Sequence, residues 1–367
     1  MIPKFHRILG RVLLHILYLI LRIFGTIKRE QFSRFISRDI DKEKNSRGSV
    51  DESKRLIIID DDVGMFWEGV WDRGHFWVNW LRITDPDGGL ELIYALRDPN
   101  VKVLGITVMM GVAPMNTCLQ AAKRILKVLD MEEIPVIPGA KTADDLGKET
   151  DAARFIVDMV KKYPNRVELI ATGPLTNIAT ALMIEPELPK YWKTLHFATG
   201  EFRGALGKIS DLFLPSLIGI PDLNTNVDVE ATKYVVENAG EFPIYPNEIM
   251  DEISLDKDDY YQIRDMKTRI AEYIIYELRI HNFLFNELTP LAGGMIPHGV
   301  VPAGIILEEG YDECEFVKFA IEVRDYGHQG HAFVLSNDPS LPKHKIYYKM
   351  NKNFKEKLYN TLIDRLT

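Results

Sequence analysis

Cysteine is almost absent from this chain of 367 residues, which has only Cys118 and Cys314. So small a number excludes a disulfide scaffold and a zinc site ligated by cysteines. An excess of positive charge is also lacking, because the formal net charge is -8 and no dense basic patch occurs. This charge argues against nucleic acid as the main partner. The length suits one large α/β domain with additions, or two smaller domains.

Long apolar runs are lacking too, with one short exception near the N-terminus. Residues 12–21 are almost wholly apolar, and lysines and arginines flank them. A spanning helix takes about 20 apolar residues, and no small-residue cleavage site follows this run. We expect residues 1–28 to form an apolar helix that anchors the protein to a membrane or lies in its interface. Residues 29–54 are expected to be a polar stalk, and the protein to be membrane-associated through this end and otherwise cytoplasmic. The alternative is a helix docked on the protein's own core.

A buried strand that runs into three carboxylates is the most informative feature. Residues 56–59 are apolar and mostly β-branched, and Asp60, Asp61 and Asp62 follow directly. Like charges at a strand end repel, so such a cluster is stable mainly when a cation or a hydroxylated ligand binds there. Ligands of open α/β sheets bind outside the carboxyl ends of the strands. This edge is the candidate active site, and a solvated acidic turn is the alternative.

The rest of the pattern predicts an α/β fold with a mostly parallel sheet flanked by helices. Expected strands at 101–108, 135–137, 167–171 and 195–198 alternate with helices at 90–96, 114–129 and 152–160 and from about 176. This alternation implies right-handed crossovers. Further helices are expected at 229–236 and 258–285, strands at 316–323 and 332–335, and a last helix at 354–366. No internal linker is visible, so residues 55–367 are expected to be one large domain.

Four of the five tryptophans lie between residues 66 and 81. Their spacing of three and four places pairs of them on one helical face. Trp67 and Trp71, beside the acidic edge, are candidates for stacking on a flat ring such as a nucleobase. A packed insertion or a subunit contact explains the same residues equally well.

Several short motifs in order resemble the inosine–uridine-preferring nucleoside hydrolase family. They are Ile59–Gly64, Leu104–Thr107, Pro135–Ala140, Val167–Ala179, Asp222–Ala231 and, more weakly, Pro297–Gly299. The resemblance covers roughly residues 55–335. It implies a nucleoside hydrolase-like fold, a role in purine or pyrimidine metabolism, and hydrolysis of the N-glycosidic bond of a ribonucleoside or related ribosyl compound. It also implies bound calcium and a small-molecule substrate, and leaves open a homo-oligomer.

The same resemblance implies roles for individual residues. Asp60, Asp62 and the carbonyl of Thr172 are expected at the metal, with Asp62 as general base. His298 is expected to protonate the departing base. The residues expected at the ribose are Asp87, Asp222 and Asn224. Alternatively, Asn224 only caps or turns before the helix at 229, and His298 is a solvated loop histidine.

The chain departs from the family at the metal. Gly88 and Gly299 stand where the family has metal-binding aspartates, and Val112 stands where an asparagine is usual. Either a nearby acid replaces the lost ligands, or the metal binds weakly or is absent. The candidate acids are Asp85, Asp87, Glu91 and Asp211. We therefore expect weak calcium binding, with slow hydrolysis or none.

Two further interpretations stay open. One is a catalytically degenerate protein that keeps the fold and binds ribose or a nucleoside; calcium binding with nucleoside turnover separates it from an enzyme. The other is a haloacid-dehalogenase-type phosphatase, in which an aspartate, any residue and an aspartate follow an apolar strand. That family also needs a later lysine and a paired acidic motif, and neither is convincing in this sequence.

Overall fold

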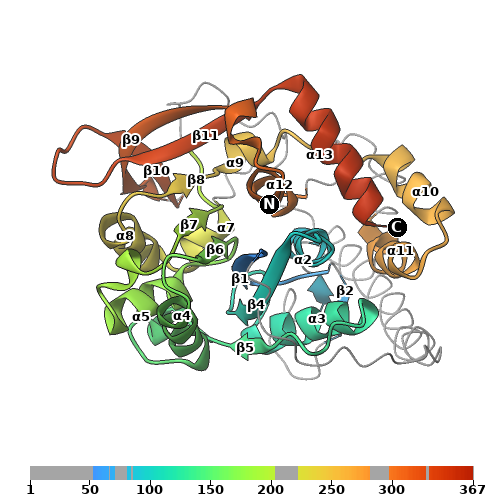
Figure 1. Cartoon of the computed structure of the whole chain (residues 1–367), viewed down its shortest axis with the longest axis horizontal. Helices are drawn as coiled ribbons and strands as arrows, with labels where there is room; N and C mark the ends of the chain where they lie inside the picture. The colour runs from blue at the N-terminus through green and yellow to red at the C-terminus, as the bar shows by residue number, and fades with distance from the viewer. Residues whose placement is uncertain are drawn as a thin grey trace, which may run out of the picture.

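A computed structural model describes residues 53–65, 67–70, 81–83, 86–202, 222–281, 297–327 and 330–366 (Figure 1). Its strands are β1 (Arg55–Asp61), β2 (Trp67–Val70), β3 (Leu81–Ile83), β4 (Val101–Val108), β5 (Val136–Pro138), β6 (Val167–Ala171), β7 (Thr194–Phe197), β8 (Pro243–Ile244), β9 (Cys314–Asp325), β10 (His331–Ser336) and β11 (His344–Met350). Its α-helices are α2 (Asp87–Leu96), α3 (Met115–Val128), α4 (Asp151–Lys162), α5 (Thr176–Ile184), α7 (Leu223–Val227), α8 (Val229–Asn238), α9 (Asn247–Met250), α10 (Lys257–Asp265), α11 (Arg269–His281), α12 (Val300–Leu307) and α13 (Lys352–Arg365). Short 3-10 turns are η1 (Ala143–Asp145), η2 (Leu188–Lys190) and η5 (Gly310–Glu313).

One nine-stranded sheet organises these elements, in the order β10-β9-β11-β8-β7-β6-β1-β4-β5. Neighbours from β5 to β11 run parallel, whereas β9 is antiparallel to both β10 and β11. The prediction of a mostly parallel sheet flanked by helices is therefore confirmed. Strand β1 lies between β4 and β6, so the acidic edge that follows it is central.

Helices cover both faces of the sheet, which explains why β1 is apolar on both sides. Ile57 and Ile59 pack into a core with residues of α2, α3, α12 and α13, and Ile58 packs into a second core with residues of α4, α5 and α8. Figure 1 shows these two groups of helices on opposite sides of the strands. A continuous apolar run is typical of a parallel strand buried in this way.

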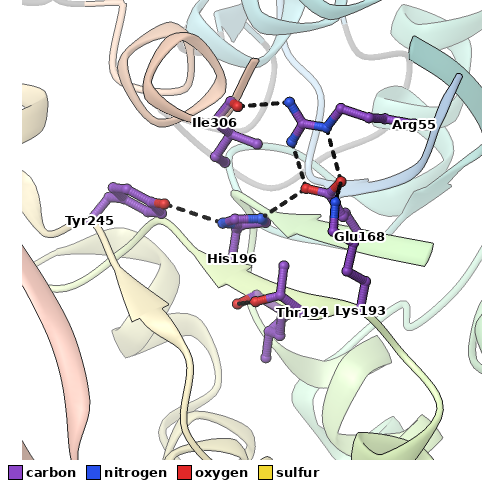
Figure 2. A network of polar contacts seen from close by, with 8 residues as sticks. Arg55, Glu168, Lys193, Thr194, His196, Tyr245 and Ile306 are labelled. Carbon is purple, nitrogen blue, oxygen red and sulfur yellow. Dashed lines mark hydrogen bonds and ion pairs between the residues drawn. The ribbon is translucent and has the colours of Figure 1, made fainter. Parts of the chain in front are cut away.

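A buried ion-pair network holds β1, β6 and β7 together near their amino ends (Figure 2). Arg55 donates to Glu168 through Nε at 2.9 Å and Nη2 at 2.6 Å, and its Nη1 donates to the carbonyl of Ile306 in α12 at 2.9 Å. His196 Nε2 lies 3.4 Å from the Glu168 carboxylate, and its Nδ1 lies 3.2 Å from the hydroxyl of Tyr245. Because Arg55 and Glu168 lie at the starts of their strands, this network lies at the edge opposite the aspartates.

Two expectations need correction. The single helix at 258–285 is wrong, because α10 and α11 are separated at Lys267, whose φ of 57° is in the left-handed region that breaks an α-helix. The helical interpretation of the tryptophan segment is wrong at its start, since β2 is extended and pairs with β3. The α12 helix was not expected, because its residues are all buried and show no helical periodicity. The expected N-terminal helix and stalk up to residue 52 lie outside the described residues.

None of the helices in the described ranges has the length and apolar character that crossing a bilayer requires.

Candidate active site

The candidate site lies at the carboxyl ends of β1, β4 and β6. Asp60 on β1 faces Thr107 of β4 and Ala171 of β6 across the sheet. Its Oδ1 accepts hydrogen bonds from the Thr107 hydroxyl at 2.6 Å and from the Asn177 amide at 2.9 Å, while Oδ2 has no partner among the described residues. Burial raises the pKa of Asp60 to about 7, although these two hydrogen bonds oppose the shift.

Four carboxylates that interact electrostatically with one another lie around the end of β1, and we call them the acidic cluster: Asp61, Asp62, Asp87 and Glu91. Glu91 is fully buried, and Asp61 and Asp62 are no more than 5% exposed. The alternative of a solvated acidic turn is therefore wrong. Burial is the main cause that raises the pKa of Asp61 and Glu91 well above the usual range, and the mutual repulsion of the cluster adds to it. In the described part of the chain, no lysine or arginine forms an ion pair with Asp61, Asp62 or Glu91.

Two glycines provide the space that two of these carboxylates occupy. An ideal Cβ on Gly88 would lie 2.3 Å from Asp61 Oδ2, and one on Gly299 would lie 2.3 Å from Glu91 Oε2. Side chains at these positions would displace the acids, since real Cβ atoms essentially never approach another atom so closely. Asp61 Oδ2 and both Glu91 oxygens are buried without a hydrogen-bond partner among the described residues.

The backbone after β4 and β6 surrounds Asp62. Its Oδ2 accepts a hydrogen bond from the amide of Val112 at 2.5 Å. An ideal Cβ on Gly111 would lie 1.7 Å from the same oxygen, and one on Gly173 would lie 2.7 Å from the Asp62 amide nitrogen. Burial raises the pKa of Asp62 to about 7, and the bond from Val112 partly opposes it. Glycines at 111 and 173 thus allow the backbone to approach this carboxylate closely.

Thr172, Asn224 and Asp222 form a second part of the site. The Asn224 amide donates to the Thr172 carbonyl at 2.6 Å. Thr172, which is expected at the metal, therefore contacts Asn224, which is expected at the ribose. Asp222 accepts from the Thr225 amide at 2.7 Å and from the Thr199 hydroxyl at 3.1 Å. The idea that Asn224 caps the helix at 229 is wrong, because the cap of α8 is Asp228.

His298 lies next to the acidic cluster and is held by an acid that the sequence analysis missed. Its Nε2 is 2.9 Å from Asp251 Oδ1, and its Nδ1 is 3.9 Å from Asp87 Oδ2. The imidazole is 30% exposed, so a ligand can reach it. Asp251 follows the short strand β8 and the helix α9, and this position at a strand's carboxyl end was the available signal.

The donor set suits a hard cation. Carboxylate, hydroxyl and carbonyl oxygens are what calcium prefers, and this site holds buried oxygens of Asp60, Asp61, Glu91 and Thr172 without hydrogen-bond partners. Within the described ranges, however, no three histidine, cysteine, aspartate or glutamate side chains are arranged as a ready metal site. Trp71, Asp85 and Asp211 lie outside the described residues, and Trp67 is described only by its backbone.

Known proteins resemble this chain in both sequence and fold. The family profile described as inosine-uridine preferring nucleoside hydrolase matches residues 83–356, a segment that begins after β1. A probable uridine nucleosidase 1 of Oryza sativa subsp. japonica is 24% identical over 219 residues, which are 52% of this chain and 65% of the relative. Uridine nucleosidase 1 of Arabidopsis thaliana is 23% identical over 219 residues, 52% of this chain and 62% of the relative. The chain thus spans less than two thirds of the length of both.

Solved structures match over more of the fold. A plant nucleoside hydrolase has a TM-score of 0.67 at 18% identity, over 85% of this chain and 99% of its own. A purine-preferring ribonucleoside hydrolase from Gardnerella vaginalis has a TM-score of 0.66 at 18% identity, over 85% of this chain and 98% of its own. At this identity the likeness establishes the fold, whereas the profile match takes in well over half of the chain. This chain belongs to the inosine-uridine preferring nucleoside hydrolase family.

Proposed function

We propose that this protein hydrolyses the N-glycosidic bond of a ribonucleoside or a related ribosyl compound, with a calcium ion at the acidic edge. Family membership removes the phosphatase interpretation. One observation carries the proposal: buried carboxylates that form no ion pair with a described lysine or arginine lie at the carboxyl end of β1, between β4 and β6, beside an accessible histidine. Such an edge is where α/β sheets bind ligands.

Calcium at Asp60, Asp62 and Thr172 would, when bound, supply a Lewis acid for the attacking water and an anchor for the sugar hydroxyls. Asp62 is the proposed general base, because the Val112 amide fixes the direction of its carboxylate at the edge. The nearby carboxylates would also favour the positive charge that develops on the sugar during glycoside cleavage.

His298 is the proposed general acid for the departing base. Asp251 lies 2.9 Å from Nε2 and holds the ring with its Nδ1 3.9 Å from Asp87 Oδ2, beside the acidic cluster. Asp87, Asp222 and Asn224 are proposed to bind the ribose hydroxyls. In that role the Asn224 amide keeps its carbonyl oxygen for the sugar while its nitrogen binds Thr172.

The direct test is a product analysis of the full chain with a panel of purine and pyrimidine ribonucleosides. The proposal expects free base and free ribose in equal amounts from at least one of them. A panel that yields no free base at any protein concentration would contradict it.

The contact between Asn224 and Thr172 also supports a second candidate, a protein that binds nucleosides without cleaving them. Each of these residues, expected at substrate or metal, is already engaged by the other. Measurable nucleoside binding by calorimetry without free base would favour this candidate over the enzyme.

The tryptophan segment is proposed to stack on the base. Trp67→Ala or Trp71→Ala should weaken nucleoside binding by about 1–3 kcal/mol, the usual contribution of an aromatic ring stacked on a base. Unchanged binding in both variants would reassign the segment to packing or assembly.

Membrane association through residues 1–28 is a separate proposal, based on the apolar run with basic flanks. In cell fractionation, full-length protein should sediment with membranes and a variant with lysines in place of residues 13, 16 and 19 should not. Equal distribution of the two forms would contradict the tether.

A further inference from the structure

We propose that Asp61 and Glu91 are cation ligands of this site, and that the glycines at 88 and 299 make room for them. The inference rests on the proposed function only in placing a cation at the acidic edge. It adds two ligands. Each of them comes from a backbone position other than that of the glycine whose side-chain space it occupies.

The two acids occupy space that a side chain at either glycine would need. Asp61 Oδ2 occupies the space in which any side chain at 88 would begin, at 2.3 Å from an ideal Cβ. Glu91 Oε2 occupies the corresponding space at 299, also at 2.3 Å. Each acid therefore occupies volume that only a glycine leaves open, at two separate points of the same cluster.

The buried oxygens of both acids also lack hydrogen-bond partners among the described residues. Asp61 Oδ2 and both Glu91 oxygens are buried without a hydrogen bond to any described residue. Burying an ionised carboxylate in this way is costly unless a cation or hydrogen-bond donors compensate it. The described lysines and arginines form no ion pair with these acids, so within the described part of the chain a bound cation or protons are left to compensate them.

The Thr172 hydroxyl is buried and faces both the Asp61 and the Glu91 carboxylates, where it favours their charged forms. Its geometry falls short of a hydrogen bond to either of them. A hydroxyl directed at two carboxylates adds a neutral oxygen donor, and hard cations such as calcium take mixed sets of this kind. The described side chains are not arranged as a ready metal site, so a bound cation would need water molecules or small side-chain rotations to complete its coordination.

The test uses calcium alone, titrated by calorimetry into the full chain and into the isosteric variants Asp61→Asn and Glu91→Gln. Each variant should weaken calcium binding by about 10- to 100-fold or more, because even groups that only orient a metal ligand account for such losses. Glu277→Gln is the matched control, since this fully buried glutamate of α11 lies outside the acidic cluster. The melting temperature should rise with calcium in the parent and the control and far less in the two variants.

Two exchange variants separate ligation from mere burial. Gly88→Asp alone should destabilise the fold because two carboxylates compete for one space, whereas Asp61→Ser combined with Gly88→Asp should regain calcium binding lost in Asp61→Ser. The pair Glu91→Ala and Gly299→Asp should behave in the same way. If a carboxylate placed at the glycine's position restores calcium binding, that carboxylate acts as a ligand of the cation.

The outcomes distinguish this inference from the proposed function. Calcium binding that is unchanged in Asp61→Asn and Glu91→Gln overturns the inference and leaves the hydrolase proposal intact. Binding that depends on both acids without any nucleoside turnover supports the inference and overturns the hydrolase. Turnover in a parent chain that binds no calcium overturns the inference, and protons then neutralise the cluster.

Discussion

Replacing Glu168 by glutamine should remove one of the strongest constraints on the centre of the sheet. Glu168 is 2% exposed and its partner Arg55 is 19% exposed. Removing one partner of a buried ion pair costs about 3–5 kcal/mol, because the other charge is left uncompensated. The partial exposure of Arg55 places the expected loss near the lower limit, at about 3 kcal/mol. Lys193, which is 52% exposed, adds little.

The pH dependence follows from the same contacts. Burial alone raises the pKa of Glu168, but hydrogen bonds from His196 and Arg55 and the charge of Arg55 outweigh it and hold the pKa well below the usual value of 4.5. A depressed carboxyl pKa contributes stability that is present above the unfolded pKa and is lost as the pH falls. The difference in unfolding free energy between parent and Glu168→Gln should therefore be constant above about pH 5.5 and shrink below about pH 4.5.

Urea denaturation of the full chain at several pH values measures this difference. Glu230→Gln is the control, because Glu230 is 72% exposed in its pair with Lys233 and should leave the midpoint unchanged. A loss below about 1 kcal/mol at pH 7, or a difference that does not shrink at low pH, would refute the reasoning.

Three further predictions concern the site and its support. Asp251→Asn should lower kcat by about 100-fold or more with little change in KM. Adding His298→Ala should cause little further loss, because the two residues act as one proton-donating unit. Multiplicative losses in steady-state kinetics would contradict this coupling. Gly105→Ala should destabilise the fold by about 1–3 kcal/mol in urea denaturation, since a Cβ there would lie 2.6 Å from the Phe155 ring. Adding Phe155→Leu should recover part of this loss, and fully additive losses in the double variant would argue against the clash. Asp62→Asn should lower turnover far more than it weakens nucleoside binding followed by calorimetry, because the variant loses the general base whereas the amide oxygen can still face a cation. Equal loss of both would assign Asp62 to binding alone.

The sequence predicted the elements whose pattern is local. The apolar runs of β1, β4 and β6 sit between clear turn signals, and the strands at 101–108 and 167–171 were expected with the observed bounds. The α12 helix was missed because a helix buried on every side has no amphipathic period. The break between α10 and α11 was missed because it depends on the left-handed backbone of Lys267, a residue type that gives no such signal.

The residues of the candidate site also differ in how far the sequence alone predicts their positions. The position of Asp60 and Asp62 follows from a strand end, which sequence reveals. The direction of the Asp61 side chain does not follow from the sequence, because it depends on the space beside Gly88 after the chain has folded. Glu91 was one of four acids weighed as a replacement ligand, and only packing against Gly299 distinguishes it. Asp251 meets His298 across 47 residues of sequence without a motif.

The most direct test of the central claim is the rate at which the full chain releases free base from uridine and inosine, measured with added calcium and with a chelator, beside Asp62→Asn. The account predicts release with calcium that the chelator stops and that added calcium restores, and no release by the variant. Equal rates in parent and variant, or no release by the parent under any condition, would contradict the claim that this acidic edge hydrolyses nucleosides.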